Sequence, residues 1–248
     1  GFLYEYETFR REYEIPITKN HDEEISGRLA RMITPFVLRR LKRDVLKDLP
    51  EKLEEVRYAK MEKKQQRLYD GQVTLMRRDI QQQSEEDFRR GKIEILAELT
   101  RIRQICCDPS LCFEDYNGGS AKRQACMDLI MSLHESGHKI LLFSQFTSML
   151  ELLEKELTGK NLRYYKIVGS TPKEKRLAMV RDFNEDDVPV FLISLKAGGT
   201  GLNLTGADAV IHYDPWWNSA AQNQATDRAH RIGQTKVVTV YKMILKDT

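Results

Sequence analysis

The chain has 248 residues, enough for one large domain or two modest domains with buried cores. Hydrophobic residues make up 41% and charged residues 31%, but 40 Lys and Arg against 37 Asp and Glu leave a net charge of only +3. The total charge therefore does not indicate a nucleic-acid partner. No apolar run approaches the roughly 18 residues of a membrane span, and the charged N-terminus does not resemble a signal peptide. We expect an intracellular protein without a membrane partner.

Four cysteines occur, at Cys106, Cys107, Cys112 and Cys126. None forms a C-x-x-C pair, so the sequence predicts neither a redox motif nor a zinc ribbon. A zinc site built from Cys107, Cys112, His134 and His138 is an alternative, but the spacing between the two pairs does not match a zinc finger. Reduced thiols are the favoured interpretation.

The first part of the chain predicts helices. Three prolines are expected to break its first fifty residues into short helices: Pro16, Pro35 and Pro50. Lys60–Asp79 and Glu85–Cys106 carry apolar residues at helical spacing. Pro109 and the turn-forming run Asp115–Ser120 then interrupt the pattern. We predict short helices joined by turns over residues 1–50 and a mainly helical extension over residues 51–118.

From residue 119 onward, short apolar runs alternate with segments of helical character. The apolar runs are Ile140–Phe143, Tyr164–Val168, Val190–Ser194, Ala209–Tyr213 and Val237–Ile244. The helical segments are Gln124–Glu135, Ser148–Leu157, Lys173–Phe183 and Ser219–Ala229. This alternation predicts an α/β fold over residues 119–248, with a parallel sheet covered by helices on both faces. Loops at the carboxyl ends of its strands are then expected to bind ligands.

Three of these loops carry residues suited to phosphate. Ser144-Gln145 follows the first strand and Gly169-Ser170-Thr171-Pro172 the second. Hydroxyls and backbone N–H groups at a helix start bind phosphate, although Ser or Thr there is more commonly only an N-cap. The third loop, Ser194–Gly206, contains Gly198, Gly199 and Gly201, which allow close approach of a ligand or neighbouring domain. It matches neither G-x-x-x-x-G-K-[ST] nor G-x-G-x-x-G.

The segment Asp214–Gln234 is the most distinctive. Both tryptophans, Trp216 and Trp217, lie in it, and a Trp beside Pro is commonly a core residue or loop anchor. Gln224, Arg228 and Arg231 recur at helical spacing, which places them on one predicted helix face. Fixed guanidinium groups suit the charge of a transferring phosphoryl group. Salt bridges to acidic side chains of a neighbouring helix are the alternative.

These segments resemble the motifs of SWI/SNF-type (superfamily-two) DNA-dependent ATPases, and the resemblance covers nearly the whole chain. Asp227–Gln234 resembles the last helicase motif of that family, Ser194–Leu204 its fifth motif and Leu141–Phe146 its fourth. Pro35–Lys52 resembles the linker between the two motor lobes, and Gly1–Pro16 resembles the tail that leaves the first lobe. The resemblance thus implies that residues 1–50 are the inter-lobe linker and the tail of a first lobe. The chain is thereby identified as a C-terminal, RecA-like motor lobe preceded by a mainly helical extension.

The resemblance implies a motor that binds ATP with Mg²⁺ between two lobes and moves along double-stranded DNA. By motif position, Arg228 and Arg231 are the catalytic arginine fingers. The residues implied near the nucleotide are Gly199, Thr200, Gly201 and Gln224. The residues implied at the DNA backbone or groove are Ser144, Gln145, Gly169, Ser170, Lys196 and Trp217. The family often has Arg at position 196, and it prefers one Trp and a later Pro where this chain has Trp216, Trp217 and Ser219.

The sequence contains no G-x-x-x-x-G-K-[ST] motif and no Asp-Glu metal box at a strand end. We therefore expect the phosphate cradle and the magnesium ligands on a first lobe of the same polypeptide, and no ATP hydrolysis by this chain alone. The implied parent is a chromatin-remodeller-like translocase, nuclear in a eukaryote and cytoplasmic in a prokaryote. An RNA helicase lobe is one alternative, disfavoured by Pro35–Lys52. A non-catalytic nucleotide-binding or protein-interaction module is another, disfavoured by the paired arginines.

Overall fold

The computed structural model describes residues 3–37, 49–82, 92–197, 201–215 and 219–248. The chain divides into two compact units, Gly1–Asp48 and Leu49–Thr248. No helix of the described residues is long and apolar enough to cross a bilayer.

The first unit consists of short helices, as predicted. They are α1 (Tyr6–Phe9), the π-helical η1 (Arg10–Glu14), α2 (Ile15–Lys19), α3 (Glu23–Ile33) and the 3₁₀ turn η2 (Thr34–Phe36). Pro16 does not break its helix as expected: α1, η1 and α2 follow one another directly, and the wider π segment lies just before the proline. Asp22 caps α3, because its carboxylate accepts a hydrogen bond from Ile25 N at 3.0 Å.

The second unit is built on a six-stranded, wholly parallel sheet in the order β1-β6-β5-β2-β4-β3. Its strands are β1 (Lys52–Ala59), β2 (Ile140–Ser144), β3 (Tyr164–Ile167), β4 (Val190–Ser194), β5 (Ala209–His212) and β6 (Val238–Leu245). Every residue of β2, β4 and β5 is buried, as expected for central strands covered on both faces. The predicted parallel sheet is confirmed.

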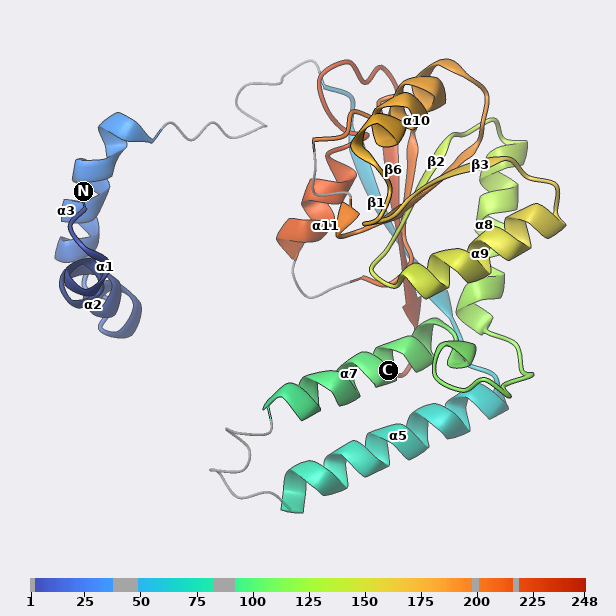
Figure 1. Cartoon of the computed structure of the whole chain (residues 1–248), viewed down its shortest axis with the longest axis horizontal. Helices are drawn as coiled ribbons and strands as arrows, with labels where there is room; N and C mark the ends of the chain where they lie inside the picture. The colour runs from blue at the N-terminus through green and yellow to red at the C-terminus, as the bar shows by residue number, and fades with distance from the viewer. Residues whose placement is uncertain (1–2, 38–48, 83–91, 198–200, 216–218) are drawn as a thin grey trace. The chain divides into compact units, whose positions relative to one another are not determined.

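Helices cover both faces of this sheet (Figure 1). α8 (Ala121–Glu135) and α9 (Thr147–Gly159) pack on one face, where they share a core with Leu142 and Leu192. α10 (Lys173–Glu185) and α11 (Ser219–Thr226) pack on the other face, where they share a core with Leu141 and Phe191. Alternate residues of one strand thus enter different cores, which is why the strands read as continuous apolar runs.

The strand β1 was not predicted. It lies in the region assigned to a mainly helical extension, yet it pairs with β6 over eight residues, from Lys52↔Val238 to Ala59↔Leu245. It is an edge strand and only Ala59 is buried, so its sequence shows alternating charges instead of an apolar run. The extension otherwise contains the expected helices, α5 (Lys63–Gln82) and α7 (Lys92–Cys107), which project side by side from the sheet, and a short 3₁₀ turn η3 (Pro109–Leu111) (Figure 1).

Candidate functional site

The loops that follow β2, β3 and β4 start side by side at the carboxyl edge of the sheet. Ser144, the last residue of β2, pairs with Ser194, the last residue of β4. Ile167, the last residue of β3, pairs with Ile193. The residues predicted in these loops therefore share one edge of the molecule, as parallel topology requires.

The loop after β2 is fixed by a buried carboxylate. Gln145 N donates to both carboxylate oxygens of Asp214, each at 3.1 Å. Ser144 is fully buried, and its hydroxyl accepts a hydrogen bond from Phe146 N at 3.1 Å. The side chain of Gln145 remains partly exposed. The loop therefore presents Gln145 to solvent and uses Ser144 internally.

The loop after β3 is organised by an arginine that the sequence did not single out. Arg176, from α10, donates Nε to Thr171 O at 2.8 Å and Nη2 to Val168 O at 3.2 Å and to Gly169 O at 2.8 Å. These carbonyls consequently point toward the guanidinium. The backbone N–H groups of Gly169 and Ser170 have no hydrogen-bond partner among the described residues, and both residues are exposed. Backbone donors free at an exposed loop suit an anionic ligand.

The loop after β4 exposes Lys196, while Ala197 N is held by Ser194 Oγ at 3.2 Å. Gly201 is exposed and has a φ of +37°, in the region that favours glycine. Gly199, Thr200 and Trp217 lie outside the described residues, so their predicted roles remain predictions.

The predicted helix face carrying Gln224, Arg228 and Arg231 is wrong. Gln224 is exposed on α11, but this helix ends at Thr226, and both arginines lie in the turns that follow. Here the backbone hydrogen bonds include the i→i−3 bonds of a tighter turn, with Arg228 N donating to Ala225 O at 3.1 Å. Arg228 O instead accepts Leu204 N at 2.9 Å, from the loop after β4. A tertiary contact thus replaces the helical pattern that the spacing indicated.

Gln234 holds this arginine-bearing turn (residues 227–234) against the rest of the unit. Its buried amide nitrogen donates to the carbonyl oxygens of Thr205, Ala207 and Ala229 at 2.8–3.1 Å. Its amide oxygen accepts the next two backbone N–H groups along the chain at 2.9–3.0 Å. In the sequence, Gln234 stood out only as the last residue of a motif. The signal that could have identified its role is the glycine before it, because Gly233 has a φ of +98° and reverses the chain.

Arg228 is a buried cation. It is 7% exposed, and its Nε has no hydrogen-bond partner among the described residues. Neither Arg228 nor Arg231 forms an ion pair with a carboxylate in the described parts of the chain. Burial lowers the pKa of Arg228, the neighbouring charge of Arg231 lowers it further, and Asp227 opposes this. Two adjacent guanidinium groups without an ion pair to a described carboxylate are suited to an anion, and the salt-bridge alternative finds no support among the described residues.

The two sets of predicted residues meet only through the far part of the loop after β4, where Leu204 N donates to Arg228 O at 2.9 Å. The loops after β2, β3 and β4 begin at the carboxyl edge, whereas the arginine-bearing turn bonds to residues that precede strands. Gln234 contacts Ala207, two residues before β5, and His230 Nε2 donates to Pro50 O at 2.7 Å, two residues before β1. The carboxyl-edge rule therefore locates the predicted DNA loops but not the arginines.

Comparisons with known proteins agree with this architecture. A SNF2-related domain matches residues 1–111, and a helicase conserved C-terminal domain matches residues 121–233. The Bacillus subtilis protein YwqA, whose name designates an ATP-dependent helicase/translocase, is 38% identical over the whole chain. The chain spans only 23–27% of the length of this and two further curated relatives.

Two solved structures from Sulfolobus solfataricus share the fold. The SWI2/SNF2 ATPase core in complex with dsDNA is 31% identical with a TM-score of 0.68, and the match covers 99% of this chain and 52% of that one. The SWI2/SNF2 ATPase C-terminal domain is 28% identical with a TM-score of 0.66, covering 80% of this chain and 81% of that one. The chain therefore belongs to the SWI2/SNF2 family of ATPases, and its sheet is a RecA-like C-terminal lobe.

Proposed function

We propose that this chain is the second motor lobe of an ATP-driven translocase of double-stranded DNA, resembling chromatin remodellers, and that it supplies arginine fingers to ATP bound by a first lobe. The observation that carries the proposal is the buried charge of Arg228 beside Arg231, with no ion pair to a carboxylate among the described residues. A structural arginine at such a depth normally pairs with a carboxylate. An arginine that meets a phosphate only when two lobes close has no such partner in the lobe alone.

Hydrolysis of ATP builds negative charge on the γ-phosphoryl oxygens, and a guanidinium stabilises that charge most strongly in the transition state. Burial restricts the side chain of Arg228, and the turn that Gln234 fixes restricts the backbone of Arg231, so both guanidinium groups are positioned for a γ-phosphate. Gln224, Gly201 and the neighbouring Gly199 and Thr200 are proposed to line the nucleotide cleft. The described residues hold no group of three or more potential metal ligands, so we assign the Mg²⁺ ligands to the first lobe.

The test uses a polypeptide that contains both lobes. Arg228→Ala and Arg231→Ala should each reduce DNA-stimulated turnover about 10³-fold or more, while the affinity for ATP changes little because the first lobe holds most of the nucleotide. Arg→Lys should restore little activity, since an ammonium lacks the planar fork. Turnover near the normal rate in Arg231→Ala would contradict its role. Lower thermal stability with turnover kept would instead identify both as structural.

DNA is proposed to contact the carboxyl edge, through Gln145, Lys196 and the free N–H groups of Gly169 and Ser170, with Trp217 near the groove. We assign Ser144 to shaping this loop, because its hydroxyl is buried and already bonded. Contacts to phosphates alone predict binding without sequence preference that weakens with salt. Duplex RNA of equal length is the control: tighter binding to RNA than to DNA would favour the helicase alternative.

A further inference from the structure

The hairpin formed by α5 and α7 is joined at its base to the segment that follows β5. Cys107, the last residue of α7, accepts a hydrogen bond at its carbonyl oxygen from the buried Tyr213 hydroxyl at 2.9 Å. Within the hairpin, Gln65 Nε2 of α5 donates to Ile105 O of α7 at 2.9 Å. The two helices are thus bonded to each other and, through Tyr213, to the sheet.

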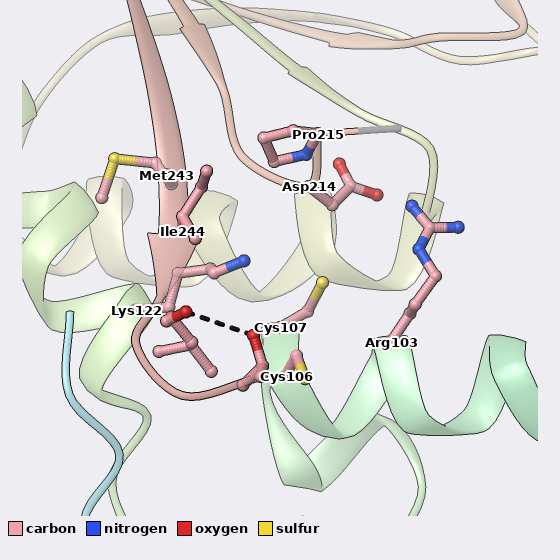
Figure 2. Close-up of a pocket in the computed structure, with 10 residues that line it drawn as sticks. Arg103, Cys106, Cys107, Lys122, Asp214, Pro215, Met243 and Ile244 are labelled. Carbon is pink, nitrogen blue, oxygen red and sulfur yellow. Dashed lines mark hydrogen bonds between the residues drawn. The ribbon is translucent and has the colours of Figure 1, made fainter. Parts of the chain in front are cut away.

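Arg103 extends from α7 toward the loop after β2. Its guanidinium lies over the ring of Phe146, with Cζ 5.5 Å from the centroid. Phe146 follows Gln145 directly and is the residue at which α9 begins. Figure 2 shows the same guanidinium directed toward the carboxylate of Asp214. Burial lowers the pKa of Arg103, and the charge of Asp214 opposes this, so the two charges interact favourably.

Asp214 joins these groups to the backbone of the loop. Both of its carboxylate oxygens accept Gln145 N, each at 3.1 Å. Burial raises the pKa of Asp214, whereas the hydrogen bond from Gln145 N, the charge of Lys122, the Ser144 hydroxyl and the charge of Arg103 lower it. The ionised carboxylate accepts the stronger hydrogen bond. Cations from α7 and α8 therefore favour the form of Asp214 that holds the loop most firmly.

We propose that Arg103 and Asp214 are positioning residues for the loop after β2. Asp214 fixes the backbone of Gln145, and Arg103 connects both Asp214 and Phe146 to the α5–α7 hairpin. This inference deepens the proposed function and rests on it, because it takes Gln145 as a DNA contact. A displacement of the hairpin would then change how Gln145 is presented to DNA, although neither positioning residue touches DNA itself.

The first measurement is the backbone amide resonance of Gln145 in the whole 248-residue chain, at slightly alkaline pH where Asp214 is ionised. A proton donated to a carboxylate in a charge-assisted hydrogen bond is deshielded. Asp214→Asn should move this resonance upfield. Arg103→Gln should shift the amide resonances of Gln145 and Phe146, while that of Gly169, in the loop after β3, stays unchanged.

The matched control is Arg101→Gln. It removes an equal charge from an exposed position of the same helix, where Arg101 lies over the ring of Phe113 at 5.3 Å and not over the loop after β2. The amide resonance of Gln145 should not change in this variant. A shift equal to that of Arg103→Gln would show that any charge lost from α7 has this effect, and would overturn the inference.

The second measurement is affinity for a short DNA duplex at low salt. Arg103→Gln and Asp214→Asn should each weaken binding several-fold, and Arg103→Lys should recover part of the loss because it keeps the charge. Removing the negative charge of Asp214 would by itself strengthen binding to DNA. A loss of affinity in Asp214→Asn therefore reports the loop and not the net charge.

A double-mutant cycle shows whether these effects pass through Gln145. Gln145→Ala removes the side chain but keeps the backbone N–H that Asp214 accepts. In the Gln145→Ala background, Arg103→Gln and Asp214→Asn should change DNA affinity much less than in the wild type. Effects of undiminished size in that background would overturn the inference.

The inference is also overturned if the Gln145 amide resonance is the same in Asp214→Asn, Arg103→Gln and the wild type. A lower melting temperature of Arg103→Gln, with this resonance and the DNA affinity of the folded variant unchanged, would assign Arg103 a structural role only. If Gln145→Ala itself binds DNA normally, the proposed DNA contact fails, and the amide resonance alone decides whether the two residues position the loop. Arg103→Gln is sufficient for both measurements if Asp214→Asn does not fold.

Discussion

Two buried ionisable side chains, a histidine and an aspartate, lie two residues apart at the end of β5. His212 is 2% exposed, its Nε2 bonds to Thr226 Oγ1 at 2.9 Å, and its Nδ1 has no partner in the described parts of the chain. Burial lowers its pKa from 6.5 to about 4. Asp214 is 4% exposed, and burial raises its pKa from 3.8 to about 6 despite the hydrogen bonds from Gln145 N. Both therefore make the free energy of unfolding depend on pH.

The two dependences have opposite signs. Between pH 6.5 and 4 the unfolded chain protonates His212 and the folded chain does not, so stability falls as pH falls. Between pH 6 and 3.8 the folded chain keeps a proton on Asp214 and the unfolded chain does not, so stability falls as pH rises. Each pKa difference corresponds to about 3 kcal/mol. We expect these two contributions to cancel approximately over this interval.

Single substitutions should expose each contribution. Relative to the wild type, Asp214→Asn should lose about 3 kcal/mol of stability as the pH falls from 6.5 to 4, because only the His212 contribution remains. His212→Asn should gain a similar amount over the same interval. The measurement is urea unfolding of the whole chain at several pH values, followed by circular dichroism. Asp115→Asn and His134→Asn, both at exposed positions, are the matched controls. If the free energies of unfolding of Asp214→Asn and of the wild type differ by the same amount at every pH, the pKa of the buried Asp214 carboxyl is not raised.

Three further outcomes are expected. Gln234→Ala should lower the free energy of unfolding, measured in urea, by about 2–4 kcal/mol, because it leaves buried backbone groups unsatisfied. The control Gln224→Ala, on the exposed face of α11, should change the free energy of unfolding by less than about 0.5 kcal/mol. Equal effects of the two substitutions would show that Gln234 does not hold the arginine-bearing turn in place. Arg228→Met should raise the free energy of unfolding by about 1 kcal/mol or more, and with it the melting temperature, since it removes a buried charge that has no ion pair among the described residues. A lower melting temperature would instead indicate that Arg228 forms an ion pair. Arg176→Lys keeps the net charge but lacks the planar guanidinium whose Nε and Nη2 together reach the three carbonyls, so duplex DNA affinity should fall several-fold with an unchanged salt slope. Unchanged affinity would remove the Gly169–Ser170 loop from the interface.

The central strands were predictable because both of their faces are buried. Ile140–Phe143 and Val190–Ser194 read as continuous apolar runs, and each became a strand flanked by helices. β1 was not predictable in this way, since an edge strand half exposed to solvent gains little from apolar side chains. Its place is set by backbone pairing with β6, which local sequence does not reveal.

The candidate site was predictable where topology decides and not where long-range hydrogen bonds decide. Parallel strands bring the Gln145, Gly169 and Lys196 loops to one edge regardless of side-chain detail. The spacing of Arg228 and Arg231 indicated a helix, but Leu204 N and the amide of Gln234 bind the carbonyls of this segment. Arg176 was overlooked because an arginine on a helix resembles an ordinary surface charge until its carbonyl partners are known.

The central claim is that this chain is half of a motor, and it is tested most directly by dividing that motor. ATP turnover on duplex DNA should be measured for this chain alone, for a first lobe alone, and for the two lobes in one polypeptide. The account predicts no DNA-stimulated turnover by either half and clear stimulation for the joined lobes. Turnover by this chain alone that disappears with Arg228→Ala would contradict the account, because it would place a complete active site within these 248 residues.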